Sequence, residues 1–230
     1  MIPQFHNSSM ATVQVVYSLC TMPEYIPDLR LEAHTVLQSG GGVWTVENLN
    51  KLHRLDSFLK ESQRMNASSF RRFQEAVSLE IADVIANAVS VGFDRKAMST
   101  IKLSDGTVIL PGDTIAMPSG PMAQDQIYYK DPTKFDGYRF FNATAKGQDA
   151  TQGLENGYTE IEPGNLSWGN GRFSCPGRWY ASLMMKLLLA KFILEYDFEF
   201  PQSQTVRPSD FVMDVHVLPD MKQRILIKKM

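Results

Sequence analysis

The most constraining stretch of this sequence is the loop SWGNGRFSCPGRWYA, residues 167–181, which places one cysteine among glycines directly before a helix-like run. Gly169, Gly171 and Gly177 permit tight backbone turns, so that amide N–H groups can converge on the sulfur of Cys175. The positive end of the following helix also favours a negative charge here. Each feature stabilises a thiolate, and the loop therefore predicts a site built around Cys175.

The other cysteine, Cys20, is expected to be a small buried hydrophobic residue. Two cysteines cannot build a disulfide framework, which fits a reducing compartment. A structural zinc site needs about four closely spaced ligands, and a cysteine protease needs a histidine base. The histidines are scattered along the sequence, at His6, His34, His53 and His216. A single thiolate ligand suits a metal that brings its own equatorial ligands, as haem does.

The composition describes an ordinary globular chain. Its 230 residues are 43% hydrophobic and carry a net charge of −2, so there is no electrostatic case for nucleic-acid binding. The best candidate for a membrane-spanning helix, ASLMMKLLLAKFILEY, is interrupted by Lys186 and Lys191, and the N-terminus lacks the pattern of a signal peptide. The chain as written is therefore expected to be soluble and cytoplasmic.

Hydrophobic periodicity predicts an α+β fold that is mainly α. Helices are expected over residues 5–20, 24–38, 45–65 and 177–195. An Asp-Gly pair within 101–120 indicates a β-hairpin, and the alternating C-terminus, 210–229, indicates a second strand hairpin.

The sequence WGNGRFSCPGR resembles the haem-binding signature of the cytochrome P450 monooxygenases, F-x-x-G-x-[RH]-x-C-x-G, and its continuation resembles the fungal branch of that family. Gly171, Cys175 and Gly177 match the signature, and Trp168 takes the aromatic position. The resemblance implies that Cys175 is the axial thiolate ligand of a haem iron. It also implies that Trp168, Gly171, Arg172 and Gly177 help to bind the cofactor.

One position of this loop departs from the family pattern. Phe173 stands two residues before the cysteine, where the family has arginine or histidine. The neighbouring Arg172 would leave the backbone in a different direction. A contact to a haem propionate is therefore expected to be lost.

Two further motifs follow the family's order. ESQR matches E-x-x-R and gives Glu61 and Arg64, while DPTKFDGYRF resembles P-x-x-F-x-x-x-R-F and gives Arg139. The resemblance implies that this Glu-Arg-Arg trio forms a structural charge network that locks the haem-side core. The alternative for Glu61 and Arg64 is an ordinary surface pair at i,i+3.

The start of the chain, FHNSSMATVQVVYSLC, resembles the second half of the family's central helix, which crosses the haem. Residues 1–230 are therefore expected to form the C-terminal, haem-binding part of a P450 domain, without the N-terminal membrane anchor. In this register His6 and Asn7 take the family's histidine and threonine positions. Asn7 and Ser8 are the candidates for the oxygen-activating position, where the Ser8 hydroxyl can act as the proton relay. The alternative for Ser8 is fraying at the end of a truncated helix.

Residues 73–95 interrupt the family's pattern. Their deletion would leave FRRKAMSTIKLSDG, a family-like join, and we interpret the segment as a translated intron. The alternative is a genuine helix, since one face would carry the apolar residues Val77, Ile81, Val84 and Ala88.

The resemblance implies a fungal haem-thiolate monooxygenase of secondary metabolism that hydroxylates a lipophilic small molecule. Electrons would come from NADPH through cytochrome P450 reductase, docking near Arg172, Arg178 and Lys186. The full-length family lies on the cytosolic face of the endoplasmic reticulum membrane. Residues 66–70 and 217–220 are the segments expected to line the substrate pocket.

Two alternatives remain open at this point. The chain could be an inactive remnant or a misdrawn gene model of such an enzyme. It could also be a non-enzymatic haem sensor that uses the Cys-Pro pair, although a sensor does not need the Glu-Arg-Arg motifs.

Overall fold

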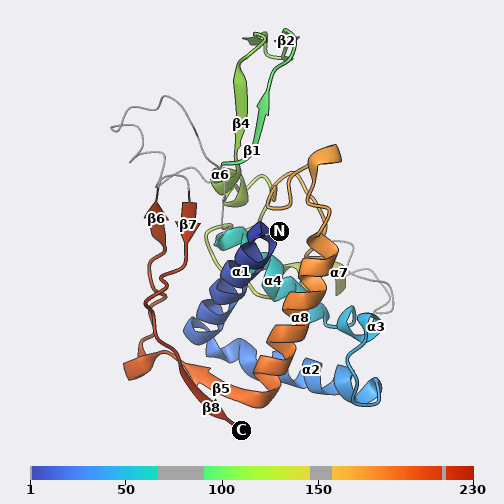
Figure 1. Ribbon diagram of the computed structural model, residues 1–230, viewed down its shortest axis with the longest axis vertical. Coiled ribbons are helices and arrows are strands. Elements are labelled where there is room, and N and C mark those ends of the chain that lie inside the picture. The colour runs from blue at the N-terminus through green and yellow to red at the C-terminus, as the bar shows by residue number, and fades with distance from the viewer. Residues whose placement is uncertain (1, 67–90, 146–156, 214–215) are drawn as a thin grey trace.

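The computed structural model describes residues 2–66, 91–145, 157–213 and 216–230 of the chain. Helices predominate in these ranges (Figure 1). The α-helices are α1 (Ile2–Thr21), α2 (Ile26–Ser39), α3 (Val46–Leu49), α4 (His53–Met65), α6 (Ser119–Ala123), α7 (Arg139–Ala145) and α8 (Arg178–Glu195). The short 3-10 helices are η1 (Pro23–Tyr25), η2 (Gly171–Phe173) and η3 (Pro201–Ser203). No helix in the described ranges is both long and apolar enough to cross a lipid bilayer.

The described strands pair two by two into small antiparallel sheets: β1 (Val91–Lys96) with β4 (Thr114–Pro118), β2 (Ile101–Lys102) with β3 (Val108–Ile109), β5 (Tyr196–Glu199) with β8 (Leu226–Lys229), and β6 (Phe211–Met213) with β7 (His216–Leu218). The predicted class, mainly α with small β-hairpins, is confirmed.

The hydrophobic core lies between four helices. α1 packs against α4 and α8, and α2 packs against α8 (Figure 1). The side chains buried there include Val15, Leu19, Leu29, Leu55, Phe58, Leu59, Met185, Leu189 and Ile193. Cys20 is buried in the same cluster, as predicted. The core fixes α8, and the loop that carries Cys175 leads directly into that helix.

The helix predicted over 45–65 is two helices in the structure, α3 and α4. Thr45 and Asn48 cap α3 reciprocally, since each backbone N–H donates to the other's side chain. α4 begins separately because the buried Glu32 carboxylate of α2 accepts the backbone N–H groups of Arg54 (2.7 Å) and Leu55 (3.0 Å). This cap comes from another helix, so periodicity within 45–65 could not reveal it.

The predicted Asp-Gly hairpin is confirmed as β2–β3, where Gly106 has φ 90° and the Leu103 N–H donates to the Thr107 carbonyl at 2.9 Å. The C-terminal prediction was partly wrong. β6 and β7 do form a hairpin, but β8 pairs with β5 instead, from Tyr196 opposite Lys229 to Glu199 opposite Leu226.

The segment interpreted as an intron falls mostly outside the described residues, and so does the helix proposed as its alternative. Its last residues, 91–95, belong to β1. Asp94 pairs with Ala116 and Arg95 pairs with Ile115 of β4. Removal of 73–95 would therefore require other residues to supply this strand.

Candidate functional site

Cys175 lies half-buried in an ordered turn just before α8. Its backbone N–H donates to the Trp168 carbonyl at 2.7 Å, which closes the loop on itself. Gly169 and Gly171 have φ values of 75° and 62°, so both occupy the left-handed region that glycine tolerates best. The N–H groups of Gly171 and Ser174 donate to oxygens within the loop, and that of Gly169 donates to the Leu166 carbonyl just before it. They therefore hold the turn that presents the thiol, rather than converging on the sulfur.

Trp168 ties the loop to the segment before it. Its indole N–H donates to the Tyr158 carbonyl at 2.7 Å, and the two rings pack edge to face with centroids 5.2 Å apart. Burial raises the pKa of the Tyr158 phenol, and the neighbouring Asp56 and Cys175 raise it further. Trp168, Tyr158 and Cys175 thus form one packed group.

Asp56 of α4 connects this group to the helical core. Its carboxylate accepts the Tyr158 backbone N–H at 2.6 Å and forms an ion pair with Lys186 of α8. Lys186 is only 5% exposed. Polar contacts therefore run from α8 through Asp56, Tyr158 and Trp168 to the Cys175 amide. Lys186 interrupts an otherwise apolar helical run. This is the one sequence signal that could have indicated a buried partner for it.

The cations predicted to form a docking surface are not together on the exterior. Lys186 is buried, and this part of the prediction was wrong because the lysine is paired inside the protein with Asp56. Arg178 is half-buried and donates to the carbonyls of Thr159 (3.1 Å) and Cys175 (3.0 Å). Arg172 is the member of this set that remains exposed.

Phe173 is 58% exposed on the same loop, and two guanidinium groups lie over its ring. Arg172 is 4.6 Å from the ring centroid and Arg95 is 4.7 Å away. Arg95 comes from β1, about 80 residues away in sequence. Sequence reasoning missed it because it falls in the segment interpreted as an intron. The structure thus places a second arginine beside the position where the family's cation is missing.

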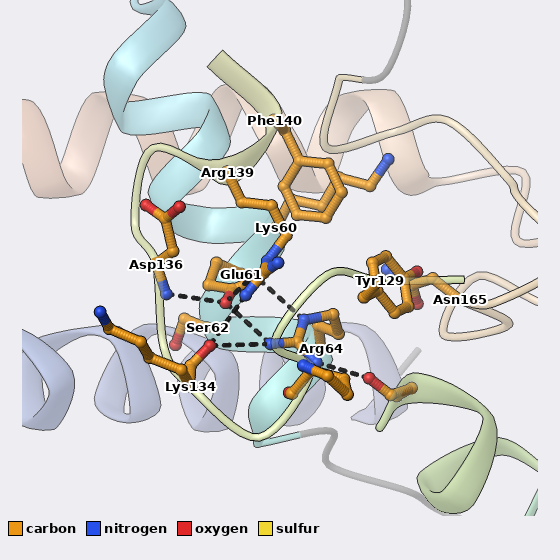
Figure 2. A network of polar contacts seen from close by, with 12 residues as sticks. Lys60, Glu61, Ser62, Arg64, Tyr129, Lys134, Asp136, Arg139, Phe140 and Asn165 are labelled. Carbon is orange, nitrogen blue, oxygen red and sulfur yellow. Dashed lines mark hydrogen bonds and ion pairs between the residues drawn. The ribbon is translucent and has the colours of Figure 1, made fainter. Parts of the chain in front are cut away.

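Glu61, Arg64 and Arg139 come together in a network that Figure 2 shows at close range. Glu61 and Arg64 are almost fully buried and paired at 2.8 Å, which excludes the surface pair considered as the alternative. Arg139 Nε lies 3.1 Å from the same carboxylate, and the Asp136 N–H donates to it at 2.9 Å.

The two arginines also bind the chain that wraps around α4. Arg64 donates to the carbonyls of Ala123 and Pro132, and Arg139 donates to that of Lys134 at 2.8 Å. The network therefore anchors the loop between α6 and α7 to α4. These contacts hold the chain in place. Glu61 accepts hydrogen bonds from the Asp136 N–H and from the guanidinium groups of Arg64 and Arg139, which balance its buried charge.

A second buried pair next to this network was not predicted. Lys60 is fully buried, and its Nζ lies 3.2 Å from Glu162 and 4.4 Å from the Phe140 ring centroid. The Tyr129 hydroxyl donates to Glu162 at 2.7 Å. Burial lowers the pKa of Lys60, while Glu162 opposes that effect. In the sequence Lys60 is part of the run Lys-Glu-Ser-Gln-Arg, which by itself suggests solvent exposure.

A polar cavity of about 690 Å³ opens beside Arg139. Its lining mixes the cations Lys130, Lys134 and Arg139 with the acids Asp131, Asp136 and Glu162. Because cations and acids are balanced, the cavity favours neither anionic nor cationic ligands. Cys175 is not part of its lining.

Asn7 and Ser8 lie near the start of α1, where Asn7 is exposed and Ser8 is half-buried. The Ser8 carbonyl accepts the Thr12 hydroxyl at 2.8 Å, which supports the helix around it. The side chain of His6 lies outside the described residues, as does most of the predicted pocket segment 66–70.

The Cys175 loop can supply one thiolate ligand and nearby cations. Within the described part of the chain, no three histidine, cysteine, aspartate or glutamate side chains gather as a metal site. The donor set at Cys175 therefore fits a metal held mainly by ligands of its own, with the guanidinium groups of Arg172 and Arg95 nearby on Phe173.

Comparison with known proteins agrees with this chemistry. A sequence model of the family described as Cytochrome P450 matches residues 85–226. Cytochrome P450 monooxygenase AN1598 of Emericella nidulans is 32% identical over 228 residues, which cover 99% of this chain and 38% of that protein. Ent-kaurene oxidase of Gibberella intermedia is 34% identical over 231 residues, with 99% and 39% covered. Cytochrome P450 monooxygenase paxP of Penicillium paxilli is 32% identical over 224 residues, with 97% and 38% covered. The chain thus spans about two fifths of the length of these relatives.

Proposed function

Because the chain belongs to the cytochrome P450 family, we propose that it forms the haem-binding part of a fungal haem-thiolate monooxygenase that oxidises a lipophilic small molecule. The observation that carries the proposal is the half-buried thiol of Cys175, presented by a closed turn that is tied to α4 and α8. The fungal relatives include ent-kaurene oxidases, which supports a role in secondary metabolism.

In this proposal Cys175 would supply the thiolate that holds the haem iron. Trp168, Gly171 and Gly177 shape the loop that carries Cys175, and Arg172 and Arg95 would bind the propionates. A bound haem supplies one-electron and oxygen chemistry, which a thiolate ligand directs toward O–O cleavage. Arg95 would thereby compensate for the aromatic residue at position 173.

At the oxygen-activating position, Ser8 is the proposed proton donor and acceptor. Its hydroxyl can pass a proton, whereas the Asn7 amide can only orient water or a hydroxyl. Asn7 is exposed and Ser8 is half-buried, so water can reach both.

The proposed electron donor is NADPH-cytochrome P450 reductase, bound at the face around Arg172. Arg178 acts indirectly here because it holds the Cys175 carbonyl, and Lys186 is excluded by its burial. For the full-length protein we propose the cytosolic face of the endoplasmic reticulum membrane.

The test is a carbon monoxide difference spectrum of the purified chain after it has been supplied with haem. A strongly red-shifted Soret band supports thiolate ligation, and turnover with reductase then tests catalysis. An ordinary band indicates a haem protein without thiolate ligation in the carbon monoxide complex, and no band indicates a remnant. Cys175→Ala must abolish the red-shifted band, while Cys20→Ala, the matched control in the core, must leave it in place. A red-shifted band that survives Cys175→Ala contradicts the assignment.

A further inference from the structure

Cys175 is held through both of its backbone groups. Its N–H donates to the Trp168 carbonyl at 2.7 Å, and its own carbonyl accepts the Arg178 guanidinium at 3.0 Å. Trp168 and Arg178 each reach one step further, to neighbouring residues of a single segment. The Trp168 indole donates to the Tyr158 carbonyl at 2.7 Å, and Arg178 Nε donates to the Thr159 carbonyl at 3.1 Å. Two separate routes therefore lead from Cys175 to the same pair of adjacent carbonyls.

Hydrogen bonds inside the loop have a different effect from these two routes. The N–H groups of Gly171 and Ser174 donate to oxygens within the loop, so they set its shape. They do not determine where the loop lies relative to the helices. The contacts with Tyr158 and Thr159 do so, because these residues lie outside the loop. A displacement of the Tyr158–Thr159 peptide would therefore displace Cys175 as well.

Tyr158 is fixed between two core helices. Its side chain is only 2% exposed, and its hydroxyl donates to the Met185 sulfur of α8 at 3.6 Å. Its backbone N–H donates to the Asp56 carboxylate of α4 at 2.6 Å. Asp56 is in turn paired with Lys186 of α8. The position of the Tyr158 amide is therefore set by α4 and α8 together.

A second anchor on α4 holds the other end of this segment. Lys60 follows Asp56 by four residues, and residues four apart lie on one face of a helix. Its Nζ lies 3.2 Å from the Glu162 carboxylate, which also accepts the Tyr129 hydroxyl at 2.7 Å. One face of α4 thus holds residues 158–162 at both ends, through buried charged groups.

We propose that the Tyr158–Thr159 peptide is the support that fixes the Cys175 thiol for the haem iron, and that Asp56 and Arg178 are positioning residues for this ligand. The inference rests on the proposed haem-thiolate function. A ligating group has to be held within about 0.5 Å of its productive position. Asp56 acts through the Tyr158 amide and the Trp168 indole, whereas Arg178 acts by joining the Thr159 and Cys175 carbonyls.

A matched pair of double variants separates the Asp56 hydrogen bond from the Asp56 charge, without any cofactor. Asp56→Asn/Lys186→Met and Asp56→Leu/Lys186→Met both replace the buried ion pair with neutral side chains of similar size. Only the asparagine can still accept the Tyr158 N–H. Amide hydrogen exchange of residues 166–177 should therefore be about tenfold faster in the leucine variant than in the asparagine variant. The β5–β8 amides, beyond the other end of α8, are the internal control. Equal exchange of residues 166–177 in the two variants overturns the role of Asp56.

Arg178→Met tests the second route and changes only a half-buried side chain. It removes the hydrogen bonds to both carbonyls, so exchange of residues 166–177 should again be about tenfold faster than in the wild type. Lys191→Met, the same type of change at an exposed position of α8, is the control and should leave this exchange unchanged. If the double variants fold poorly, equal exchange in Arg178→Met and Lys191→Met overturns the support by itself.

The carbon monoxide difference spectrum of the haem-loaded variants then measures ligation separately from stability. The ratio of the red-shifted band to the ordinary band gives the share of bound haem that keeps its thiolate. We expect this ratio to fall about tenfold from the asparagine to the leucine double variant, and from Lys191→Met to Arg178→Met. Equal ratios despite faster exchange overturn the positioning role. If the wild-type chain shows no red-shifted band, the proposed function and the role in ligation fail together, whereas hydrogen exchange still decides whether the support exists.

Discussion

Lys186 of α8 forms a buried ion pair with Asp56 of α4, and Asp56 in turn holds the Tyr158 amide that precedes the cysteine loop. We expect Lys186→Met to lower the free energy of unfolding by about 3–5 kcal/mol, because it leaves a buried carboxylate without its counter-charge. Urea denaturation followed by circular dichroism measures the change. Lys191→Met, at an exposed position of the same helix, is the control and should have no measurable effect. Equal stability of the two variants would show that the pair does not support the fold.

Trp168→Phe keeps an aromatic ring but removes the indole N–H that the Tyr158 carbonyl accepts. A lost neutral hydrogen bond costs about 1 kcal/mol, so we expect haem to leave the variant roughly fivefold faster than the wild type. Transfer of haem to excess apomyoglobin gives the rate. Trp179→Phe changes an exposed tryptophan on the neighbouring turn and should leave the rate unchanged. Identical rates for both variants would argue that Trp168 acts through its ring alone.

The two cysteines should differ sharply in reactivity. Burial, with a smaller contribution from Glu199, raises the pKa of the Cys20 thiol to about 12, whereas Cys175 is half-exposed. At about pH 8, iodoacetamide should therefore label Cys175 and spare Cys20 in the folded apoprotein. Peptide mass spectrometry measures the labelling, and urea-unfolded protein, in which both react, is the control. Prior addition of haem should protect Cys175. Labelling that haem does not reduce would count against ligation at that thiol.

His53, at the start of α4, should make stability depend on pH. Burial lowers its pKa below the ordinary 6.5. The Asp56 carboxylate opposes this effect, whereas the Lys186 cation adds to it. Between the lowered pKa of the folded state and the ordinary pKa of the unfolded state, the unfolded chain binds more protons than the folded one. The stability that neutral His53 contributes is therefore present above about pH 6.5 and is lost as the pH falls through the lowered pKa. Urea midpoints at about pH 7.5 and about pH 5.5 should differ less in His53→Gln than in the wild type. The exposed His34→Gln is the control, and an equal pH effect in all three proteins would contradict the prediction.

The pairing of β1 with β4 bears on the interpretation of residues 73–95 as a translated intron. Deletion of residues 73–95 would bring Phe70-Arg71-Arg72 next to Lys96, where Phe93-Asp94-Arg95 now stands. The Phe-x-Arg-Lys order is the same, so the new segment can pair with β4 in the present register, with Arg72 in the place of Arg95. We therefore expect mature transcripts to lack these codons, and the shortened chain to be at least as stable as the present one. Transcripts that retain the whole segment would refute the intron interpretation.

Much of the site could be predicted from the sequence because its signals are local. The glycines before Cys175, the helix that follows and the Asp-Gly hairpin each depend on residues a few positions apart, whose backbone preferences act within one turn. The E-x-x-R spacing likewise places Glu61 and Arg64 on one face of a helix. These features are determined by the chain itself, wherever it packs.

Tertiary structure decided which polar groups have partners. Glu32 starts α4 from another helix, β8 joins β5 across an excursion of more than twenty residues, and Arg95 reaches Phe173 from β1. The same holds for Lys186, which reads as a surface cation in the sequence but is buried against Asp56. A charge looks the same in sequence whether it faces water or a partner. Packing in the folded protein removes the water around a charged side chain. The buried charge then needs a polar partner, which can come from a distant part of the chain.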